Sequence, residues 1–247
     1  MSLLTQNSEL KPHGIFNWTI PAWYTRLSNG DFFKTCPNAG ACAKVCYARN
    51  GTYLFRNVAK AHKRNLEMVL DDRYAWQKAM IEECSAKRLR RTGVPRVLPE
   101  GAEVHLLDVW LRNWVHTGGK AVRIHDAGDF FAEWYLELWL QIAEACPHIL
   151  FYAYTKEVTM FKTRQSPYPI NFRYLFSTGG LQDDLIMGND RHADVFPSEE
   201  AIQKAGYMSQ DASDLLAVLL PTNRIGIPAN NIKHFNKKID GRRFSEM

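Results

Sequence analysis

Residues 121–155 read AVRIHDAGDFFAEWYLELWLQIAEACPHILFYAYT, and this stretch decides the fold. Two short apolar runs, 121–124 and 149–154, flank a segment from 132 to 145. In that segment Trp134, Leu138 and Ile142 recur at helical spacing, and Pro147 follows just beyond it. A strand, a helix and a second strand in this order form a parallel unit, because the helix carries the chain back along the sheet. The stretch therefore predicts an α/β fold.

Neighbouring segments continue this alternation of strands and helices. Residues 14–25, 103–109 and 173–176 are short apolar and aromatic runs typical of strands. Residues 53–70 and 72–91 have helical spacing, and 215–220 (LLAVLL) repeats the pattern of an apolar run followed by polar residues. We therefore expect an α/β fold with largely parallel strands, whose closure into a TIM-barrel-like form, incomplete or decorated, stays open at this length.

The chain has the length and composition of one globular domain. Its 247 residues, 46% of them hydrophobic, suffice for one large core, so we expect a single α/β domain over 1–247, with two small domains as the alternative. Within it, 35–48 is a cysteine loop, 92–101 is a linker or turn, and 233–247 is a basic tail. The net charge of +5 has the sign that nucleic-acid binding requires.

The sequence also bounds the cellular location. No apolar run reaches the roughly 18 to 20 residues that a membrane span needs. The first residues have neither the basic nor the apolar region of a signal peptide. We therefore expect a cytoplasmic protein with no membrane partner.

Three of the five cysteines, Cys36, Cys42 and Cys46, lie in the loop TCPNAGACAKVCYA (residues 35–48). Clustered thiols in a reducing compartment indicate a metal rather than a disulfide framework. The loop contains a proline and a glycine, so it can turn back on itself and bring three thiolates to one ion. Zinc needs a fourth nitrogen or sulfur ligand, for which His62 is the nearest candidate and His125 the second.

Two other interpretations of the thiols stay open. A [4Fe-4S] cluster held by three cysteines is the alternative cofactor, because it leaves one iron free for a ligand. Three reduced thiols that bind nothing are the purely structural interpretation. Cys84 and Cys146 occupy apolar positions of helical segments, and we expect both in the core.

The strand at 121–124 leads directly into His125, Asp126, Ala127, Gly128 and Asp129. In parallel α/β folds the reacting groups lie at the carboxyl ends of strands. Small residues let a ligand approach the backbone, and paired carboxylates can divide the roles of nucleophile and acid/base. We predict that Asp126 and Asp129 are catalytic and that His125 binds substrate. For Asp129 the alternative is a cap on the helix at 132–145.

The next two strands also end in polar residues. Lys156 and Glu157 follow the run at 149–154, and the loop STGG (177–180) follows the run at 173–176. We expect these loops at the same mouth, where the glycine loop offers backbone N–H groups to a base or phosphate. The alternatives are a solvated surface pair and a plain turn. The predicted substrate-binding residues here are Lys156, Glu157, Ser177, Gly179 and Gly180.

Basic residues alternate with aromatic residues after the cysteine loop. Such a surface suits a phosphate backbone and unstacked bases. A basic helical face that is merely solvated is the alternative. The predicted nucleic-acid-binding residues are Arg49, Arg56, Lys60, Lys63 and Arg64.

Several motifs occur in an order that resembles one family. They are TIPAWYT (19–25), TCPNAGACAKVCYARNGTY (35–53), VRIHDAGDFF (122–131), CPHI (146–149) and FYAYTKE (151–157). Together they resemble the phage proteins grouped as gene product 88-like, and the resemblance covers residues 19–157.

A narrower resemblance concerns residues 126–130. The string DAGDF is similar to the Asp-Ser-Gly-Gly-Phe motif of the phage 7-deazaguanine DNA transglycosylases, relatives of tRNA-guanine transglycosylase. The resemblance implies a TIM-barrel-like enzyme with two aspartates and a zinc site made of cysteines and a histidine. It also implies that Asp126 is the acid/base and base-recognition aspartate. The second aspartate stays open among Asp129, Asp183, Asp184 and Asp214.

These inferences combine into one hypothesis, a base-exchange enzyme that replaces guanine in DNA with a 7-deazaguanine such as preQ0. A carboxylate would attack C1′ of the nucleotide, and the target base would be flipped out or met in single-stranded DNA. Two alternatives belong to other classes. One is an iron-sulfur radical or redox enzyme, and the other is a zinc-stabilised nucleic-acid-binding module in which Asp126 and Asp129 are structural.

Overall fold

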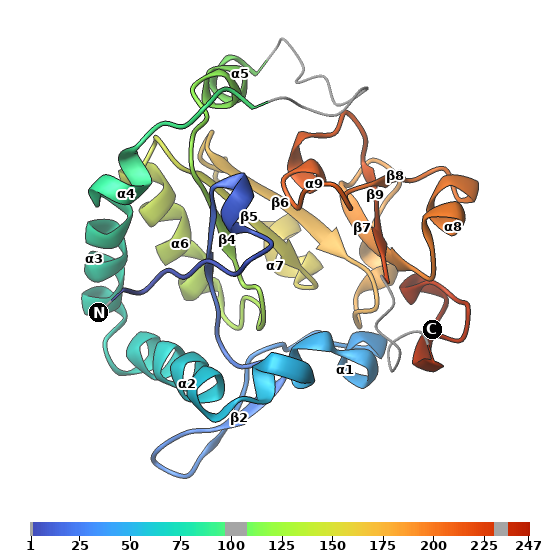
Figure 1. Ribbon diagram of the computed structural model, residues 1–247. Helices are drawn as coiled ribbons and strands as arrows, with labels where there is room; N and C mark the ends of the chain where they lie inside the picture. Colours follow the sequence, from blue (N-terminus) through green and yellow to red (C-terminus); the bar gives the residue numbers. More distant parts are fainter. Residues whose placement is uncertain (1, 97–107, 230–236) are drawn as a thin grey trace.

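A computed structural model describes residues 2–96, 108–229 and 237–247 (Figure 1). Seven strands form one sheet in the order β1-β4-β5-β6-β7-β9-β8, and every pairing in it is parallel. The strands of this sheet lie side by side in the order in which they occur in the chain, except that β9 lies between β7 and β8. The strands are β1 (Ile15–Trp18), β4 (Ala121–Ile124), β5 (Leu150–Thr155), β6 (Phe172–Ser177), β7 (His192–Phe196), β8 (Met208–Ser209) and β9 (Arg224–Pro228).

The predicted α/β fold with parallel strands is confirmed. The barrel is not, because β1 and β8 form the two edges of the described sheet and no pairing joins them. A separate antiparallel hairpin consists of β2 (Tyr24–Arg26) and β3 (Phe32–Lys34). The helices are α1 (Ala41–Val45), α2 (Arg56–Asp71), α3 (Arg73–Cys84), α4 (Lys87–Arg90), α5 (Val109–His116), α6 (Glu133–Ala145), α7 (Val158–Thr163), α8 (Glu199–Lys204) and α9 (Leu216–Leu219).

The stretch at 121–155 folds as predicted, into β4, α6 and β5. Helix α6 begins at Glu133 with Ala132 as its N-cap and no side-chain cap. The alternative interpretation of Asp129 as the cap of this helix is therefore wrong. The predicted helix at 72–91 is two helices, α3 and α4. The side chain of Asp72 caps α3 by accepting hydrogen bonds from the N–H groups of Tyr74 and Ala75.

Two predicted elements differ from the structure or lie outside it. The run at 215–220 is not a strand but contains the short helix α9, with helical hydrogen bonds from Leu219 N to Leu215 O and from Leu220 N to Leu216 O. Because every residue of this run is apolar, its sequence had no periodicity that could separate helix from strand. Most of the predicted strand at 103–109 lies outside the described residues, and Val109 begins α5. Residues 97–101 of the linker and 233–236 of the basic tail also lie outside them.

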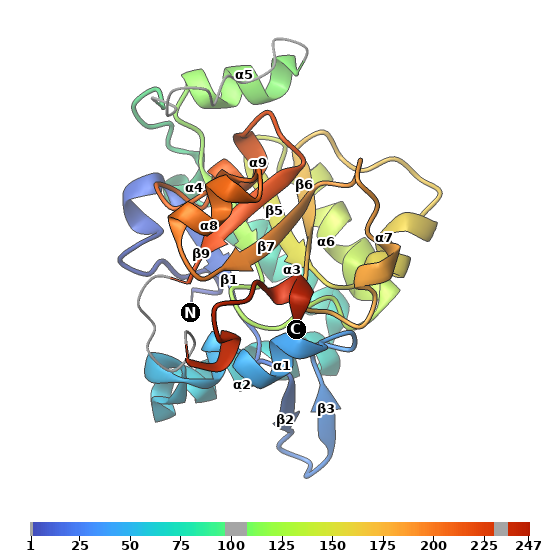
Figure 2. The same cartoon turned by 90° about the vertical axis from the view of Figure 1, so that its right-hand side faces the viewer.

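The sheet has a packed core on each face (Figure 2). On β5, Phe151 and Ala153 face the core that α3, α6 and α7 cover, and Leu150 and Tyr152 face the core that α5 and α9 cover. This alternation follows from the two-residue period of a strand. Cys84 and Cys146 are fully buried in the first core, as predicted. No helix in the described part of the chain is long and apolar enough to span a bilayer.

The loop after β4 closes tightly onto the segment after β1. Ile20 N donates a hydrogen bond to Ala127 O at 3.2 Å. Gly128 has φ +88°, a left-handed conformation, and a Cβ there would lie 2.2 Å from Ile20 Cγ1. Only glycine therefore fits at this point of the loop.

Replacing Gly128 with alanine should lower the free energy of unfolding by about 2 to 5 kcal/mol, because the left-handed backbone costs about 1 to 2 kcal/mol and the overpacking about 1 to 3 kcal/mol. Gly188→Ala is the matched control, since a Cβ at Gly188 meets nothing within 4 Å. Urea denaturation of both variants measures the difference. Equal stabilities would show that this loop can relax around a side chain.

Candidate active site at the carboxyl edge of the sheet

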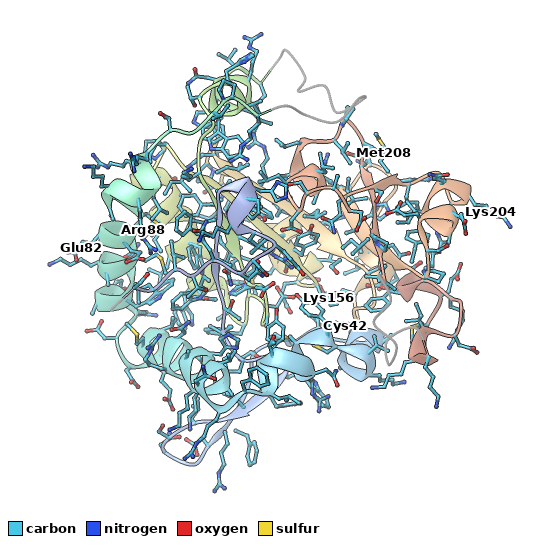
Figure 3. All side chains as sticks on the ribbon, in the orientation of Figure 1. Cys42, Glu82, Arg88, Lys156, Lys204 and Met208 are labelled. Atoms are coloured by element: carbon cyan, nitrogen blue, oxygen red, sulfur yellow. The ribbon has the colours of Figure 1, made fainter. Side chains whose placement is uncertain are left out.

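The three predicted loops lie at one edge, because β4, β5 and β6 are parallel neighbours. Hydrogen bonds join them directly. Lys156 N donates to Asp129 Oδ2 at 2.9 Å, and Lys156 Nζ donates to Ser177 Oγ at 2.7 Å. The cysteine loop lies over the same edge, where Cys42 N donates to Gly179 O at 3.0 Å (Figure 3). The acidic loop and the cysteine loop therefore shape one region.

Two carboxylates at this edge share one guanidinium group. Arg123 Nη1 lies 3.3 Å from Asp126 Oδ1 and 3.5 Å from Asp214 Oδ2. Burial opposes the charge of Arg123, but the charges of Asp214 and Asp126 outweigh that effect and raise its pKa well above the ordinary value. The side chains are 11–17% exposed, so solvent reaches all three. They form the charged centre of the candidate site.

Tyrosine hydroxyls complete the hydrogen bonding of the two carboxylates. Tyr53 donates to Asp126 Oδ2 at 2.5 Å, and Tyr154 donates to Asp214 Oδ1 at 2.8 Å. Tyr152 donates to the other oxygen of Asp214. Burial raises the pKa of these tyrosines above the ordinary value, so the hydroxyls stay neutral donors. Tyr47 donates to the backbone carbonyl of Asp126.

Asp129 has a different environment from Asp126. Its side chain accepts hydrogen bonds from Thr155 Oγ1, Lys156 N and Phe130 N at 2.7 to 2.9 Å. The residue is 5% exposed, and burial raises its pKa although these hydrogen bonds oppose the shift. The two predicted catalytic carboxylates share no contact partner. Asp129 therefore connects the β4 and β5 loops.

Glu157 is a second buried acid beside Asp129. It is 4% exposed, and its carboxylate accepts hydrogen bonds from Asn38 N at 3.1 Å and Asn38 Nδ2 at 2.5 Å. Burial, together with the charge of Asp129, raises the pKa of Glu157 to about 7. The cysteine loop is thus held to the β5 loop by an acid that titrates near neutrality.

The glycine loop at 177–180 does not present the N–H groups of its two glycines to a ligand. Gly179 N and Gly180 N donate to the carboxylate of Asp183 at 2.7 and 2.9 Å. Asp183, one candidate for the second aspartate, therefore holds this loop. Asp184, another candidate, is exposed.

His125 lies in the core beneath the site. It has φ +67° and is 3% exposed, and burial lowers its pKa to about 3. Its Nε2 lies 3.0 Å from Tyr135 Oη, while its buried Nδ1 has no hydrogen-bond partner in the described residues. The imidazole is therefore neutral, and a role in substrate binding stays a prediction.

The predicted metal ligands do not form a complete set. Cys36 Sγ accepts a hydrogen bond from Trp23 N at 3.3 Å, and burial together with the charge of Asp129 raises its pKa to about 12. Burial and Cys42 raise the pKa of Cys46 to about 11. His62 packs against the Tyr53 ring, with ring centroids 5.9 Å apart.

Within residues 2–96, 108–229 and 237–247, no three His, Cys, Asp or Glu side chains could hold a metal ion. The thiols as arranged do not fit a zinc ion or a cluster.

The predicted nucleic-acid-binding residues divide into two groups. Arg56 and Lys60 are exposed on α2, next to Phe55, which is 58% exposed. The exposed Arg49 lies over the ring of Trp23, 4.4 Å from its centroid, and its Nη1 donates to Ala43 O at 3.2 Å. These three cations are accessible to a ligand.

The other two predicted cations have partners within the protein. Lys63 lies 3.8 Å from Glu67 Oε1 in an ion pair one turn along α2. Arg64 is half-buried and donates to Asn65 Oδ1 at 3.1 Å. Both are less available to a phosphate than Arg49, Arg56 and Lys60.

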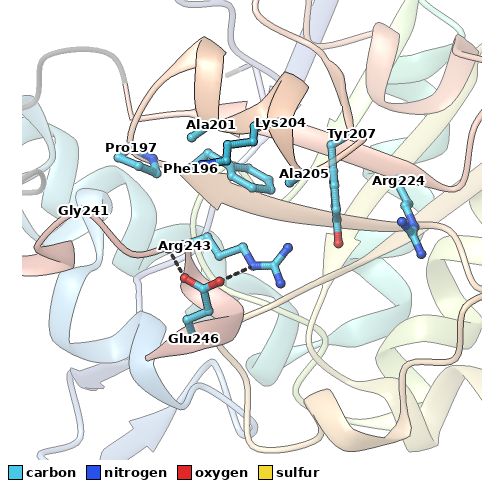
Figure 4. Close-up of a pocket in the computed structure, with 10 residues that line it drawn as sticks. All are labelled: Phe196, Pro197, Ala201, Lys204, Ala205, Tyr207, Arg224, Gly241, Arg243 and Glu246. Carbon is cyan, nitrogen blue, oxygen red and sulfur yellow. Dashed lines mark hydrogen bonds and ion pairs between the residues drawn. The ribbon is translucent and has the colours of Figure 1, made fainter.

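A pocket of about 620 Å³ lies away from the residues that the sequence predicted (Figure 4). Lys204, Arg224 and Arg243 line it, together with Glu246, which pairs with Arg243 Nε at 3.0 Å. Arg243 also lies 3.7 Å from Asp194, a fully buried acid on β7. The pocket thus adjoins the C-terminal segment and not the Asp126–Arg123–Asp214 centre.

The fold and the site define an α/β protein with a carboxylate-bearing centre at the carboxyl edge of a parallel sheet. The chain matches the gene product 88 family over residues 1–246, and it belongs to that family. This confirms the resemblance that the motif order indicated. No curated protein and no solved structure gives a significant match to the chain.

The raised pKa of Glu157 predicts a specific pH dependence of stability. The folded protein keeps this proton up to about pH 7, whereas glutamate ordinarily has a pKa of 4.5. The stability from Glu157 is therefore fully present below pH 4.5 and is lost as the pH rises through about 7. Glu157→Gln should remove that loss, which thermal denaturation between pH 4.5 and 8 measures.

Glu82→Gln, at an exposed position on α3, is the control and should follow the wild-type pH dependence. A difference between wild type and Glu157→Gln that does not change with pH would contradict the raised pKa.

Proposed function

We propose that this protein is a base-exchange enzyme that replaces guanine in DNA with a 7-deazaguanine of the preQ0 type. The observation that carries the proposal is that Asp126 and Asp214 both lie beside the same guanidinium nitrogen, Nη1 of Arg123. Glycosyl transfer with a covalent intermediate needs one carboxylate as nucleophile and a second group for proton transfer. This centre supplies two carboxylates in one partly exposed position.

The structure favours Asp214 over Asp129 as the second carboxylate. Asp129 is 5% exposed, and its carboxylate accepts hydrogen bonds from Thr155, Lys156 and Phe130 that hold the loops together. Asp214 shares Arg123 with Asp126 and is 13% exposed at its side chain. In the proposal Asp126 keeps the acid/base and base-recognition role that the resemblance implies, and Asp129 positions the loop that carries Asp126.

The proposed exchange has two steps. A carboxylate oxygen of Asp214 bonds to C1′ as the C1′–N9 bond breaks, and guanine leaves with the bonding electrons and a proton from an acid. The incoming deazaguanine loses a proton to a base, and its ring nitrogen bonds to C1′ and displaces the carboxylate. Nothing is oxidised or reduced. Arg123 between the carboxylates reduces the repulsion of two like charges.

The proposal needs no step at the thiols. Zinc or a [4Fe-4S] cluster at Cys36, Cys42 and Cys46 stays a prediction that the described arrangement does not support. The TIM-barrel relationship also belongs to the proposal, and its support is the chain order of the strands from β1 to β9. Arg49, Arg56 and Lys60 are the proposed phosphate contacts, and DNA is the proposed partner.

The direct test is nucleoside mass spectrometry of DNA incubated with the protein and preQ0. Wild-type protein should produce a new nucleoside, and Asp126→Asn and Asp214→Asn should each reduce its formation by at least about 100-fold, because each removes a group that takes part in proton transfer or covalent chemistry. Asp71→Asn, at an exposed position on α2, is the control and should retain activity.

The absence of a new nucleoside with wild-type protein would refute base exchange. If Asp214→Asn kept full activity and Asp129→Asn lost it, Asp129 and not Asp214 would be the nucleophile.

A further inference from the structure

The β2–β3 hairpin projects from the body of the molecule beside the candidate site (Figure 2). Its base is attached to the site itself. Asp129 N donates to Thr35 O at 3.0 Å, and Thr35 N donates to Trp23 O at 2.8 Å. Trp23 N in turn donates to Cys36 Sγ. The hairpin therefore has a fixed attachment to the loop that carries Asp126.

The pairing register of the hairpin gives it two different faces. Tyr24 pairs with Lys34, Thr25 with Phe33, and Arg26 with Phe32. Residues opposite each other in an antiparallel pair lie on the same face, and the faces alternate along each strand. Phe33 lies on the inner face, where its ring meets the ring of Phe131 edge-on at 5.0 Å. The outer face carries Tyr24, Arg26, Phe32 and Lys34.

The aromatic residues of this outer face are open to solvent. Phe32 is 76% exposed and Tyr24 is 49% exposed. Large aromatic side chains at these exposures gain little from burial, so packing within this chain does not explain them. Their presence on a projecting hairpin indicates a ligand that covers them.

Each of these aromatics has a cation beside it. Arg26 lies 5.9 Å from the centre of the Phe32 ring, and Lys34 lies 6.0 Å from the centre of the Tyr24 ring. Arg26 Nε donates a hydrogen bond to Gly30 O at 3.1 Å, and the charge of Lys34 partly opposes the raised pKa of Glu157. Neither cation forms a close ion pair within the described ranges of the chain.

The same pattern continues toward the site. The Tyr24 ring meets the Trp23 ring edge-on at 5.0 Å, and Arg49 lies over Trp23. A row of aromatic rings with cations beside them thus runs from the hairpin to the cysteine loop.

The exposed rings and the cations beside them together indicate which class of ligand fits this face. An apolar protein surface would cover the rings but would leave the cations without water or counter-charge, which is costly. An unpaired nucleic-acid strand offers flat bases for the rings and phosphates for the cations at the same time. We propose that the outer face of the β2–β3 hairpin, with Trp23 and Arg49, binds the unpaired bases of a DNA strand. The inference rests on the proposed function for its choice of DNA.

The test is fluorescence anisotropy with a labelled 12-nucleotide oligothymidine. Tyr24→Ala/Phe32→Ala should weaken binding by roughly 10-fold or more, because the loss of one stacked base costs about 5-fold or more. Tyr74→Ala is the matched control, since Tyr74 is 63% exposed on α3 and has Arg73 5.0 Å from its ring centre. The control should bind as the wild type does, and both proteins should keep the wild-type melting temperature.

Tyr24→Phe/Phe32→Tyr should restore binding, because it keeps both rings. No binding by the wild type, or a double alanine variant within twofold of Tyr74→Ala, would overturn the inference. So would a ring-preserving variant as weak as the alanine variant. Oligothymidine binding and base exchange are measured separately on the wild-type protein. A failure of exchange alone leaves the hairpin site intact, and a failure of oligothymidine binding alone leaves base exchange intact.

Discussion

The buried carboxylate of Asp129 is the interaction on which the arrangement of this edge depends. It accepts hydrogen bonds from the β5 loop through Thr155 and Lys156, while its own N–H donates to Thr35 at the base of the hairpin. One residue therefore joins three segments that are far apart in the sequence. A carboxylate buried in this way is tolerated only because donors satisfy its oxygens, and loss of one donor would leave a costly buried acceptor. The position of Asp126, three residues earlier, follows from this junction.

Several features of the site were predictable because they depend on local sequence. The runs at 121–124, 149–154 and 173–176 became β4, β5 and β6, and parallel geometry then placed their following loops at one edge. The role of Asp214 was not predictable, because it lies beside Arg123 only through the fold. The sequence does contain one indication of such a residue. Arg123 is a charged residue within a buried strand, and a buried charge needs a partner of opposite charge.

The different environments of Asp126 and Asp129 also could not be predicted from the sequence. Asp126 and Asp129 are close in sequence and were predicted as a pair, yet the first contacts Arg123 and Tyr53 and the second contacts backbone N–H groups and Thr155. Gly128 between them has a left-handed backbone, so the loop lacks the repeating geometry of a helix or a strand. A spacing of three residues is informative in a helix or a strand, where the backbone repeats, but not in a loop of this kind.

The covering of the edge limits the direction from which a substrate approaches. Above β6, the cysteine loop lies against Gly179, and a Cβ on this glycine would also lie 3.0 Å from Phe244 of the C-terminal segment. Asp194, fully buried on β7, holds that segment by accepting hydrogen bonds from the backbone and side chain of Ser245. The β6 and β7 side of the edge is thus covered from two directions. Above β4 the cover is the turn at 47–54, where Tyr47 donates to the backbone carbonyl of Asp126 and is 39% exposed, so solvent reaches this side of the edge.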